Sequence, residues 1–293
     1  MSKLSYLSYC LAHRFSRAVC PGCGSAASIR IDAKFCNLST LLQCKECYLR
    51  YRCPTDSQVK NYNYYQDSYI QKGLTTDLPG KKELDSLLKV KFAGTEKDFS
   101  AYSGVIKEIS RYLGRKLTIL DYGANWGYSC FQFSHYDEVE SVYGLELSKP
   151  RREFGETNLG VKYIDSPSDL IASVDLLFSS HVIEHMSNPS MIKDCADRVL
   201  KSDGVVLLAC PNGSDSARFS SPGWSKLWGE VHPNFISDQY LCRLFADYCG
   251  TIIGDEIFSL NLGLDRLICG KTGSSLPVTS NMFLIAQKRC LLA

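Results

Sequence analysis

Four cysteines near the N-terminus have the spacing of a metal site. They form the pairs Cys20-Pro-Gly-Cys23 and Cys44-Lys-Glu-Cys47, in the pattern C-x2-C-x20-C-x2-C. Two residues between cysteines make a tight turn that directs both sulfurs at one ion, and two such turns complete a tetrahedron. The spacing therefore predicts a structural Zn²⁺ in a zinc ribbon, where a four-cysteine site has no open position for catalysis. The alternative is two chance pairs of free or redox-active thiols.

A glycine-containing turn carries the second chemical signal. The segment from Leu117 to Tyr128, LTILDYGANWGY, has the pattern of a strand, a glycine turn and the start of a helix. Glu146 follows Gly127 by 19 residues, at the end of the next expected strand. An acid there can accept hydrogen bonds from both hydroxyls of a ribose, so the pair indicates a nucleoside-containing ligand.

The turn does not have the spacing of a dinucleotide site. The pattern G-x-G-x-x-G, counted from Gly123, would need glycines where Asn125 and Tyr128 stand. The carboxylate of Asp121 would also repel a pyrophosphate, whereas it would suit the ammonium group of a methionine moiety. Asn125 tolerates a left-handed conformation better than most residues, so we expect the turn to be kept.

The form Asp121-x-Gly123-x-Asn125-x-Gly127 resembles motif I of the class I S-adenosylmethionine (SAM)-dependent methyltransferases, E/D-x-G-x-G-x-G. Three later segments resemble the same superfamily, in the same order: VDLLFSSHVIEHMSNP (174–189), LKSDGVVLLACPN (200–212) and EVHPNFIS (230–237). A cysteine ribbon and a tyrosine-rich segment ahead of such a domain are similar to a bacterial subgroup common in polysaccharide, deoxysugar and secondary-metabolite biosynthesis.

The resemblance implies SAM as the cofactor and assigns its contacts by position. Asp121, Gly123, Asn125 and Gly127 would hold the methionine part and Glu146 the ribose. Asp165, just after the third strand, is a candidate for the adenine amino group. His181, at the end of the fourth strand, would lie near the sulfonium.

Methyl transfer to a hydroxyl gains from a general base. The candidates are His232, His181 and Glu230, and His232 is favoured because the 211–237 insertion follows the fifth strand, where acceptor loops usually lie. Trp224 and Trp228 in the same insertion suit stacking on a sugar or aromatic ring. The alternative is that His232 is a structural cap beside Pro233.

The string His181-x-x-Glu184-His185 also matches an inverted zincin motif, H-x-x-E-H. That motif needs a helix, whereas here it follows an apolar strand and ends at Asn188-Pro189. Some quinone-biosynthesis O-methyltransferases resemble this turn and bind a divalent ion near the acceptor, so Glu184 and His185 could do the same. The alternative is that they orient the turn through hydrogen bonds.

Alternating strands and helices position these residues. Near-continuous apolar strands alternating with helices predict a Rossmann-like, doubly wound, mostly parallel seven-stranded α/β sheet, with an antiparallel edge from the last two strands. The expected strands are 117–121, 140–146, 161–164, 174–180, 204–210, 251–258 and 282–288, and the expected helices are 96–113, 127–135, 149–158, 189–200 and 238–248.

We expect three parts: a zinc ribbon over 1–60, a connecting or lid segment over 61–95, and the methyltransferase domain over 96–293. The connecting segment is irregular and contains the tyrosine-dense stretch 61–69, which is interpreted either as packing between domains or as a lid over a ligand. The mildly apolar start is interpreted as a short helix or arm and not a signal peptide.

Composition limits the function classes. Of 293 residues, 45% are hydrophobic and 22% charged, which excludes wholesale disorder. No apolar run reaches the roughly 18 residues of a membrane span. Half of the 14 cysteines lie in residues 1–60, and with no export signal this clustering favours metal binding in a reducing cytoplasm. Residues 1–60 carry nine basic and three acidic side chains, a modest basic excess.

The leading function is methylation of a small-molecule or glycan-precursor acceptor, with a hydroxyl as the expected target. An RNA methyltransferase that grips its substrate with the basic ribbon is the second hypothesis, although no arginine-rich run supports nucleic acid as a partner. The third is a non-catalytic SAM-binding protein, for which Asn125 is the one supporting feature. The acceptor and the oligomeric state do not follow from the sequence.

Overall fold

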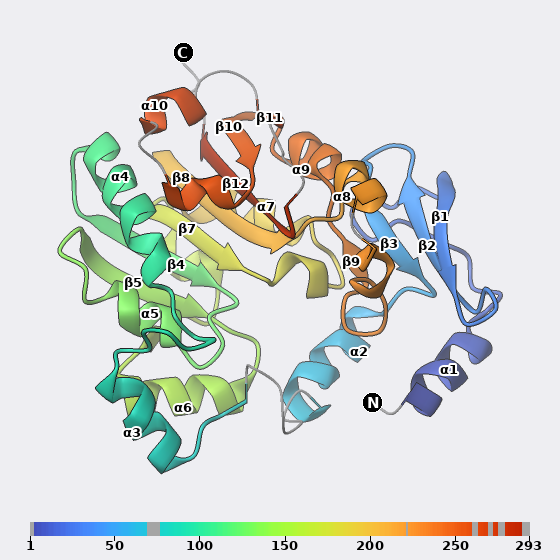
Figure 1. Cartoon of the computed structure of the whole chain (residues 1–293), viewed down its shortest axis with the longest axis horizontal. Helices are drawn as coiled ribbons and strands as arrows, with labels where there is room; N and C mark the ends of the chain where they lie inside the picture. Colours follow the sequence, from blue (N-terminus) through green and yellow to red (C-terminus); the bar gives the residue numbers. More distant parts are fainter. Residues whose placement is uncertain are drawn as a thin grey trace.

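The computed structural model describes residues 3–68, 77–220, 222–259, 263–268, 272–274 and 279–288. The part of the chain so described holds an eight-stranded sheet in the order β11-β10-β12-β8-β7-β4-β5-β6 (Figure 1). Strands β6, β5, β4, β7 and β8 run parallel, whereas β12 runs antiparallel to both β8 and β10. The chain passes from β4 to β5 on one side and later returns to β7 on the other side of β4. The strand order therefore reverses at β4, where open α/β sheets bind ligands.

The strands of this sheet agree closely with the sequence pattern. They are β4 (Leu117–Tyr122), β5 (Val139–Leu145), β6 (Lys162–Tyr163), β7 (Val174–Ser180), β8 (Leu200–Pro211), β10 (Tyr248–Ile253), β11 (Gly273–Ser274) and β12 (Asn281–Lys288). The mostly parallel α/β sheet and the antiparallel pairing of the two late strands are confirmed. The two-residue β11 is an addition to the seven expected strands, and it pairs with β10 in parallel.

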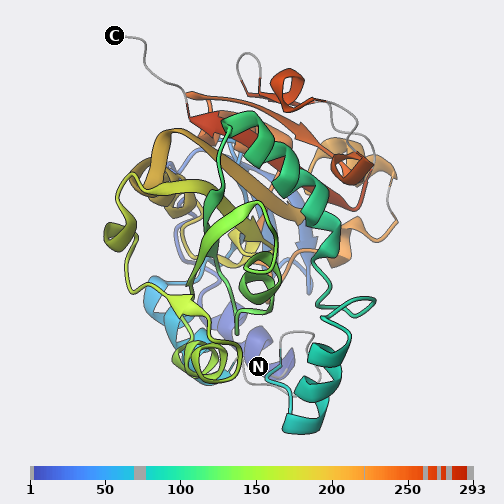
Figure 2. The same cartoon turned by 90° about the vertical axis from the view of Figure 1, so that its left-hand side faces the viewer.

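One face of the sheet is covered by α4 (Ser103–Leu113), α5 (Tyr128–Phe133) and α10 (Leu264–Leu267). Figure 2 shows α4 lying across the front of the strands. Apolar residues at Val105, Ile106 and Ile109 of α4 are buried against the sheet because their spacing places them on one side of the helix. Gly114 ends this helix in the left-handed conformation, with φ 67°.

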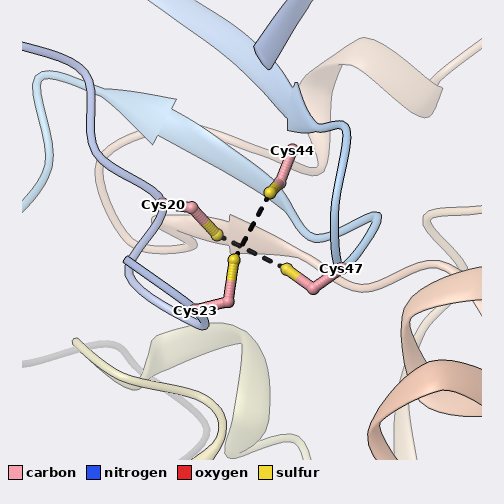
Figure 3. Close-up of side chains that lie close together, drawn as sticks. All are labelled: Cys20, Cys23, Cys44 and Cys47. Atoms are coloured by element: carbon pink, nitrogen blue, oxygen red, sulfur yellow. Dashed lines mark hydrogen bonds between the residues drawn. The ribbon is translucent and has the colours of Figure 1, made fainter. Parts of the chain in front are cut away.

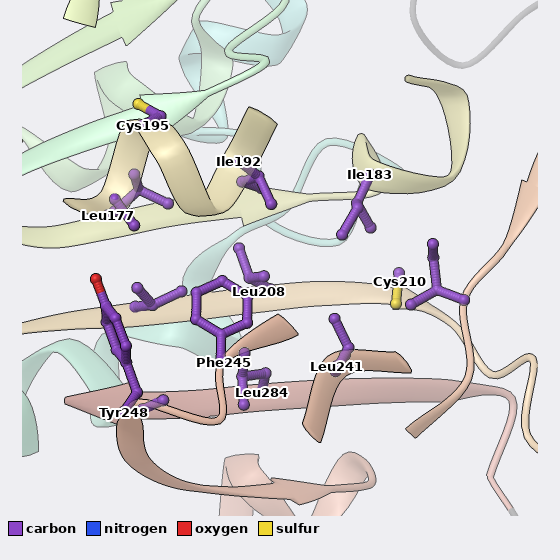
Figure 4. Packing of buried hydrophobic residues seen from close by; sticks show 14 of the residues in the cluster. Leu177, Ile183, Ile192, Cys195, Leu208, Cys210, Leu241, Phe245, Tyr248 and Leu284 are labelled. Carbon is purple, nitrogen blue, oxygen red and sulfur yellow. The ribbon is translucent and has the colours of Figure 1, made fainter. Parts of the chain in front are cut away.

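The other face is covered by α7 (Met191–Val199) and α9 (Asp238–Leu244). Ile192 and Cys195 of α7, Leu177 and Leu208 of the central strands, and Phe245 just after α9 interlock in one buried cluster (Figure 4). The ribbon residues Cys20, Cys44, Leu49 and Tyr51 belong to the same cluster. The ribbon therefore shares a hydrophobic core with the large sheet.

The N-terminal part forms a second sheet. After α1 (Lys3–Ala12), strands β1 (Ser28–Lys34), β2 (Ser39–Cys44) and β3 (Arg50–Cys53) pair antiparallel. The fourth strand, β9 (Asn234–Phe235), comes from the insertion after β8 and pairs with β3. The short helix expected at the start of the chain is α1, although Met1 and Ser2 lie outside the described residues.

The segment expected to be irregular contains two helices, α2 (Gln58–Asn63) and α3 (Lys81–Lys89), and a π-helical turn, η1 (Tyr64–Ser68). In α3, Leu84, Leu87 and Leu88 pack in a cluster with Phe92 and Trp126. Their i, i+3, i+4 spacing is a helical signal that the expectation of an irregular segment overlooked. Tyr69, the end of the tyrosine-dense stretch, lies outside the described residues.

Several element boundaries differ from expectation, such as the start of β8 at Leu200, four residues before the expected start. The helix expected from 96 begins with a 3₁₀ turn, η2 (Ser100–Tyr102), because the Asp98 carboxylate accepts the backbone N–H groups of Gly94 and Ser100 and fixes a turn. The helix expected to reach 248 ends at Leu244, since Tyr248 already pairs with Lys288 in the sheet. The strand expected over 251–258 ends at Ile253, and Asp255–Ser259 forms the 3₁₀ turn η6.

The remaining elements are short or peripheral. They are α6 (Lys149–Leu159), α8 (Asp215–Ser220), η3 (Pro167–Leu170), η4 (Ile183–His185) and η5 (Trp224–Lys226). Among the described residues, none of the helices has the length and apolar character that a membrane span needs.

Candidate active site

A cleft of about 560 Å³ opens at the carboxyl ends of β4, β5 and β7. This lies where the strand order reverses, and the volume is within the usual range for small-molecule sites. Its lining includes Gly123, Asn125, Glu146, Asp165 and His181, which come from different turns at this edge of the sheet. Five of the residues expected to contact the cofactor are therefore brought to one cavity.

The glycine turn is built so that its backbone lies against the cleft. Gly123 has φ 82°, and a Cβ atom there would overlap the side chain of Val182. Asn125 has φ 54°, and it keeps the left-handed conformation expected in place of glycine. Its backbone oxygen accepts a hydrogen bond from Tyr163 Oη at 2.8 Å, and its own Oδ1 accepts from the backbone N–H of Trp126.

Glu146 is fixed beside this turn by backbone donors. Its Oε2 accepts the N–H of Asn125 at 2.9 Å, and its Oε1 accepts the N–H of Ser148 at 2.8 Å. Burial raises the pKa of Glu146, and these hydrogen bonds oppose that effect. Each carboxylate oxygen retains a lone pair that can accept a ribose hydroxyl. The carboxylate, the open turn and the cleft volume fit a bound SAM.

Asp121 and Gly127 are not among the residues that line the cleft. The Asp121 carboxylate lies beneath the turn, where it accepts hydrogen bonds from Ser129 Oγ and, at 3.7 Å, from Cys130 Sγ. Burial and the charge of Glu146 raise the pKa of Asp121 to about 7. Gly127 precedes α5 with φ 82°, and a Cβ there would press on Val161 and Tyr163. Both residues shape the turn from inside.

Asp165 lies at the rim of the cleft. Its side chain is largely exposed, and its Oδ1 pairs with Arg152 Nη2 at 2.7 Å. This position, just beyond β6, is compatible with a contact to a base bound at that end of the cleft.

His181 is the expected catalytic candidate that lines the cleft. It follows β7 in the left-handed conformation (φ 55°), and about half of its side chain is exposed. Its Nδ1 lies 3.3 Å from Oε1 of Glu184, which is buried. Burial alone would lower the pKa of His181, but the contact with Glu184 and its negative charge raise it above the ordinary value. The pair places a buried carboxylate beside a candidate base.

His232 and Glu230 are not among the cleft-lining residues. His232 lies behind His185, with ring centroids 4.6 Å apart, and its Nδ1 lies 2.7 Å from the carbonyl oxygen of Leu227. Burial raises the pKa of Glu230. His185, which does line the cleft, is thus in direct contact with His232.

The expectation that Trp224 and Trp228 stack on an acceptor ring is wrong. Both are buried, at 4% and 2% exposure, in a cluster with Leu41 and Phe235 beneath the ribbon. Trp228 Nε1 donates to Asp32 Oδ2 at 2.9 Å. The two tryptophans hold the ribbon on the insertion instead of facing the cleft.

The tyrosine-rich segment, interpreted from the sequence either as packing between domains or as a lid, supplies a wall of the cleft. Tyr62 and Tyr65 line the cavity together with Asn61. Asn61 Nδ2 donates to the carbonyl of His185 at 2.9 Å, and Gln66 Nε2 donates to the carbonyl of Leu147. The segment thus touches both the turn after β7 and the turn after β5, as a lid would.

The four ribbon cysteines converge on one point (Figure 3). Cys20 Sγ lies 3.5 Å from Cys47 Sγ, and Cys23 Sγ lies 3.5 Å from Cys44 Sγ. A tetrahedral Zn²⁺ with bonds of about 2.3 Å needs sulfurs roughly 3.8 Å apart, so the set fits this ion. Both turns end in the left-handed conformation, at Gly24 (φ 75°) and Tyr48 (φ 65°).

The ribbon is connected to the cleft through the backbone of the insertion. Arg52 N donates to the carbonyl of Pro233 at 2.7 Å, and β3 pairs with β9 directly after it. On its other side the insertion offers the carbonyl of Val231 to His185 Nδ1, and Asn234 Nδ2 donates to the carbonyl of Met186. His185 and Met186 line the cleft, so the ribbon supports its wall.

Comparisons with known proteins agree with this geometry. Residues 95–248 match a family model described as a methyltransferase domain. A solved structure of the plantazolicin methyltransferase BpumL, bound to a pentazolic desmethyl-plantazolicin analogue and S-adenosylhomocysteine, is similar at 12% identity, with a TM-score of 0.50, over 78% of this chain and 96% of that chain.

Geranyl diphosphate C-methyltransferase from Streptomyces coelicolor A3(2) is similar at 18% identity, with a TM-score of 0.48, over 80% of this chain and 98% of that chain. A comparison with curated proteins finds no match.

Proposed function

Since this chain belongs to the class I SAM-dependent methyltransferases, we propose that it transfers a methyl group to a hydroxyl of a small-molecule or glycan-precursor acceptor, with His181 as the general base. The observation that carries the proposal is the His181–Glu184 pair at the wall of the cleft. SAM supplies the methyl group on a sulfonium, so the protein has to position it against the acceptor and accept one proton.

Positioning begins at the cofactor end of the cleft. Glu146 would accept the ribose hydroxyls, and the open backbone at Gly123 would lie against the methionine part. Asp121 holds the turn from below through Ser129, so its contribution to binding is indirect. Well-oriented reactants can account for roughly 7–11 kcal/mol of a reaction barrier, which makes this rigidity the larger part of catalysis.

His181 would take the proton of the acceptor hydroxyl as the methyl group is transferred. Its Nδ1 is directed at Glu184, which leaves Nε2 as the basic atom on the exposed side of the ring. The buried Glu184 carboxylate, 3.3 Å from Nδ1, would stabilise the charge that the ring gains. A general base of this kind contributes about 10²–10⁴-fold.

The acceptor end of the cleft favours a ring-bearing molecule. Tyr62 and Tyr65 give it aromatic surface, and Met186 gives it apolar surface. Aromatic rings and apolar patches suit the faces of sugars and aromatic compounds. The four cysteines would hold a structural Zn²⁺ that keeps the ribbon, and with it this wall, in place.

The test is a methyl-transfer assay with isotopically labelled SAM, run in parallel on nucleotide sugars, a metabolite extract and RNA. We expect label in a small molecule at an oxygen atom, and none in RNA. SAM affinity is measured separately by calorimetry. Label in RNA would overturn the acceptor class, and tight SAM binding without transfer to any acceptor would overturn the enzymatic proposal.

A further inference from the structure

We propose that Glu184, His185 and His232 form a second metal site, for a divalent transition-metal ion, between the turn after β7 and the insertion after β8. One ligand atom from each of the three residues lies within 4.8 Å of the other two. Glu184 Oε1 lies 3.9 Å from His185 Nε2, a separation that two ligands of one ion can have at about 2.1 Å each. The site does not depend on the proposed reaction.

The two histidines are held in the orientation of metal ligands. His185 Nδ1 lies 2.9 Å from the carbonyl oxygen of Val231, and His232 Nδ1 lies 2.7 Å from the carbonyl oxygen of Leu227. A ring that donates its Nδ1–H to a carbonyl keeps Nε2 unprotonated and free to bind an ion. Histidines that ligate metals are oriented by such second contacts as a rule.

Glu184 lacks the partners that a buried carboxylate needs. Its side chain is 1% exposed, and neither carboxylate oxygen has a hydrogen bond in the described part of the chain. His181 Nδ1 is near Oε1 but not in hydrogen-bonding geometry. A buried charge without hydrogen bonds is costly, and a bound cation is one of the ways proteins compensate it. The second oxygen, Oε2, likewise accepts no hydrogen bond from the described residues and is available to an ion.

The donor set indicates the class of ion. Two imidazoles and one carboxylate suit Zn²⁺, Fe²⁺ or Mn²⁺, whereas Mg²⁺ and Ca²⁺ prefer oxygen ligands throughout. Three protein ligands leave at least one coordination position open, unlike the closed four-cysteine site. His185 lines the cleft, so an ion here would border the acceptor end and fasten the insertion to the turn after β7.

The experiment counts metal ions in the full-length chain. The protein is stripped with a chelator and reconstituted with Co²⁺, and the ion content is measured by mass spectrometry along with the absorption spectrum. Thiolate-ligated Co²⁺ absorbs strongly in the near ultraviolet, which reports the cysteine site separately from the histidine site. We expect two ions per chain in the natural protein.

The variants are His185→Ala and His232→Asn, and the second keeps an amide that can donate to the Leu227 carbonyl. Each should lose one ion and its weak visible bands while the thiolate absorption is unchanged. The matched control is His135→Ala, which changes an exposed histidine just after α5 and should keep both ions. Three results would overturn the proposal. The natural protein could lack the ion that the histidine site is expected to hold, the control variant could lose that ion, or His232→Asn could retain it.

Discussion

The two ends of the cleft are built in different ways. The cofactor end is made mainly from one stretch, residues 117–146, which holds β4, the glycine turn and the end of β5, with Asp165 added at the rim. The acceptor end is assembled from α2 and η1, the turn after β7, and the insertion that the ribbon supports. The cofactor end, built from residues close in sequence, should keep its structure when distant parts of the chain are changed. The acceptor end, assembled from distant segments, should be disturbed by such changes.

Removal of the proposed base should have the largest effect and should be confined to the acceptor end. His181→Ala should lower kcat by about 10²–10⁴-fold, because it removes the ring proposed to accept the proton of the acceptor hydroxyl. SAM affinity should change little, since the contacts of Glu146 and the glycine turn remain. Kinetics on the acceptor and calorimetry with SAM give the two values. His135→Ala is the control, and a His181→Ala variant with unchanged kcat would remove this residue from the mechanism.

A change at the cofactor end should instead lower the affinity for SAM. Glu146→Ala removes the acceptor of the ribose hydroxyls and leaves the N–H groups of Asn125 and Ser148 without a partner. Hydrogen bonds to a charged group are worth about 1.5–3 kcal/mol each, so SAM affinity should fall by about 10²-fold or more.

Calorimetry with SAM measures this loss, and Glu140→Ala, an exposed acid on the same strand, should leave the affinity unchanged. Equal affinities in the two variants would contradict the assignment of the ribose to Glu146.

The assembled end should depend on the ribbon. Cys44→Ser removes one of the four thiolates, so the ribbon should loosen and release its hold on the insertion at Pro233 and β9. Hydrogen exchange should become at least tenfold faster at residues 231–236 while residues 117–146 keep their protection. Cys36→Ser, an exposed thiol outside the cluster, is the matched control. Faster exchange throughout both segments would contradict the separation of the two ends.

The same contrast explains what could be predicted from the sequence. The glycine turn, Glu146 and His181 follow from short motifs because parallel strands bring their carboxyl ends to one edge of the sheet. The position of the tryptophans could not be predicted from the sequence, because Trp228 is buried against Asp32 of the ribbon, nearly 200 positions away. His232 was placed at the acceptor for its position in the insertion, yet the insertion turns toward the ribbon and His232 stands behind His185.

Asp121 gives a pH-dependent test of the cofactor end. Its pKa is raised from 3.8 to about 7 in the folded chain, so the folded state holds a proton that the unfolded state releases. Stability should therefore fall as the pH rises from about 4 to about 7. Asp121→Asn should remove this part of the slope, as read from the difference between denaturation curves of the two proteins without SAM. Parallel curves over that range would mean that the carboxyl is already ionised in the fold.

The smallest effect is expected in the ribbon itself. Tyr48 holds a left-handed conformation that costs a side chain roughly 1–2 kcal/mol, and glycine would relieve this strain. The greater freedom of glycine in the unfolded chain offsets part of that gain. Tyr48→Gly should raise the free energy of unfolding by about 0.5–1 kcal/mol. Gly24→Ala should lower it by a similar amount, since a Cβ there meets no neighbour and the strain is purely conformational. Denaturant titration of both variants measures whether the free energy of unfolding rises or falls.

The proposed transfer of a methyl group from SAM to a hydroxyl can be followed by mass spectrometry. The chain is incubated with SAM carrying a deuterated methyl group and a metabolite extract. We expect a small molecule that gains one labelled methyl on oxygen with the natural protein and not with His181→Ala. A label on carbon, on nitrogen or on RNA, or equal labelling by both proteins, would contradict it.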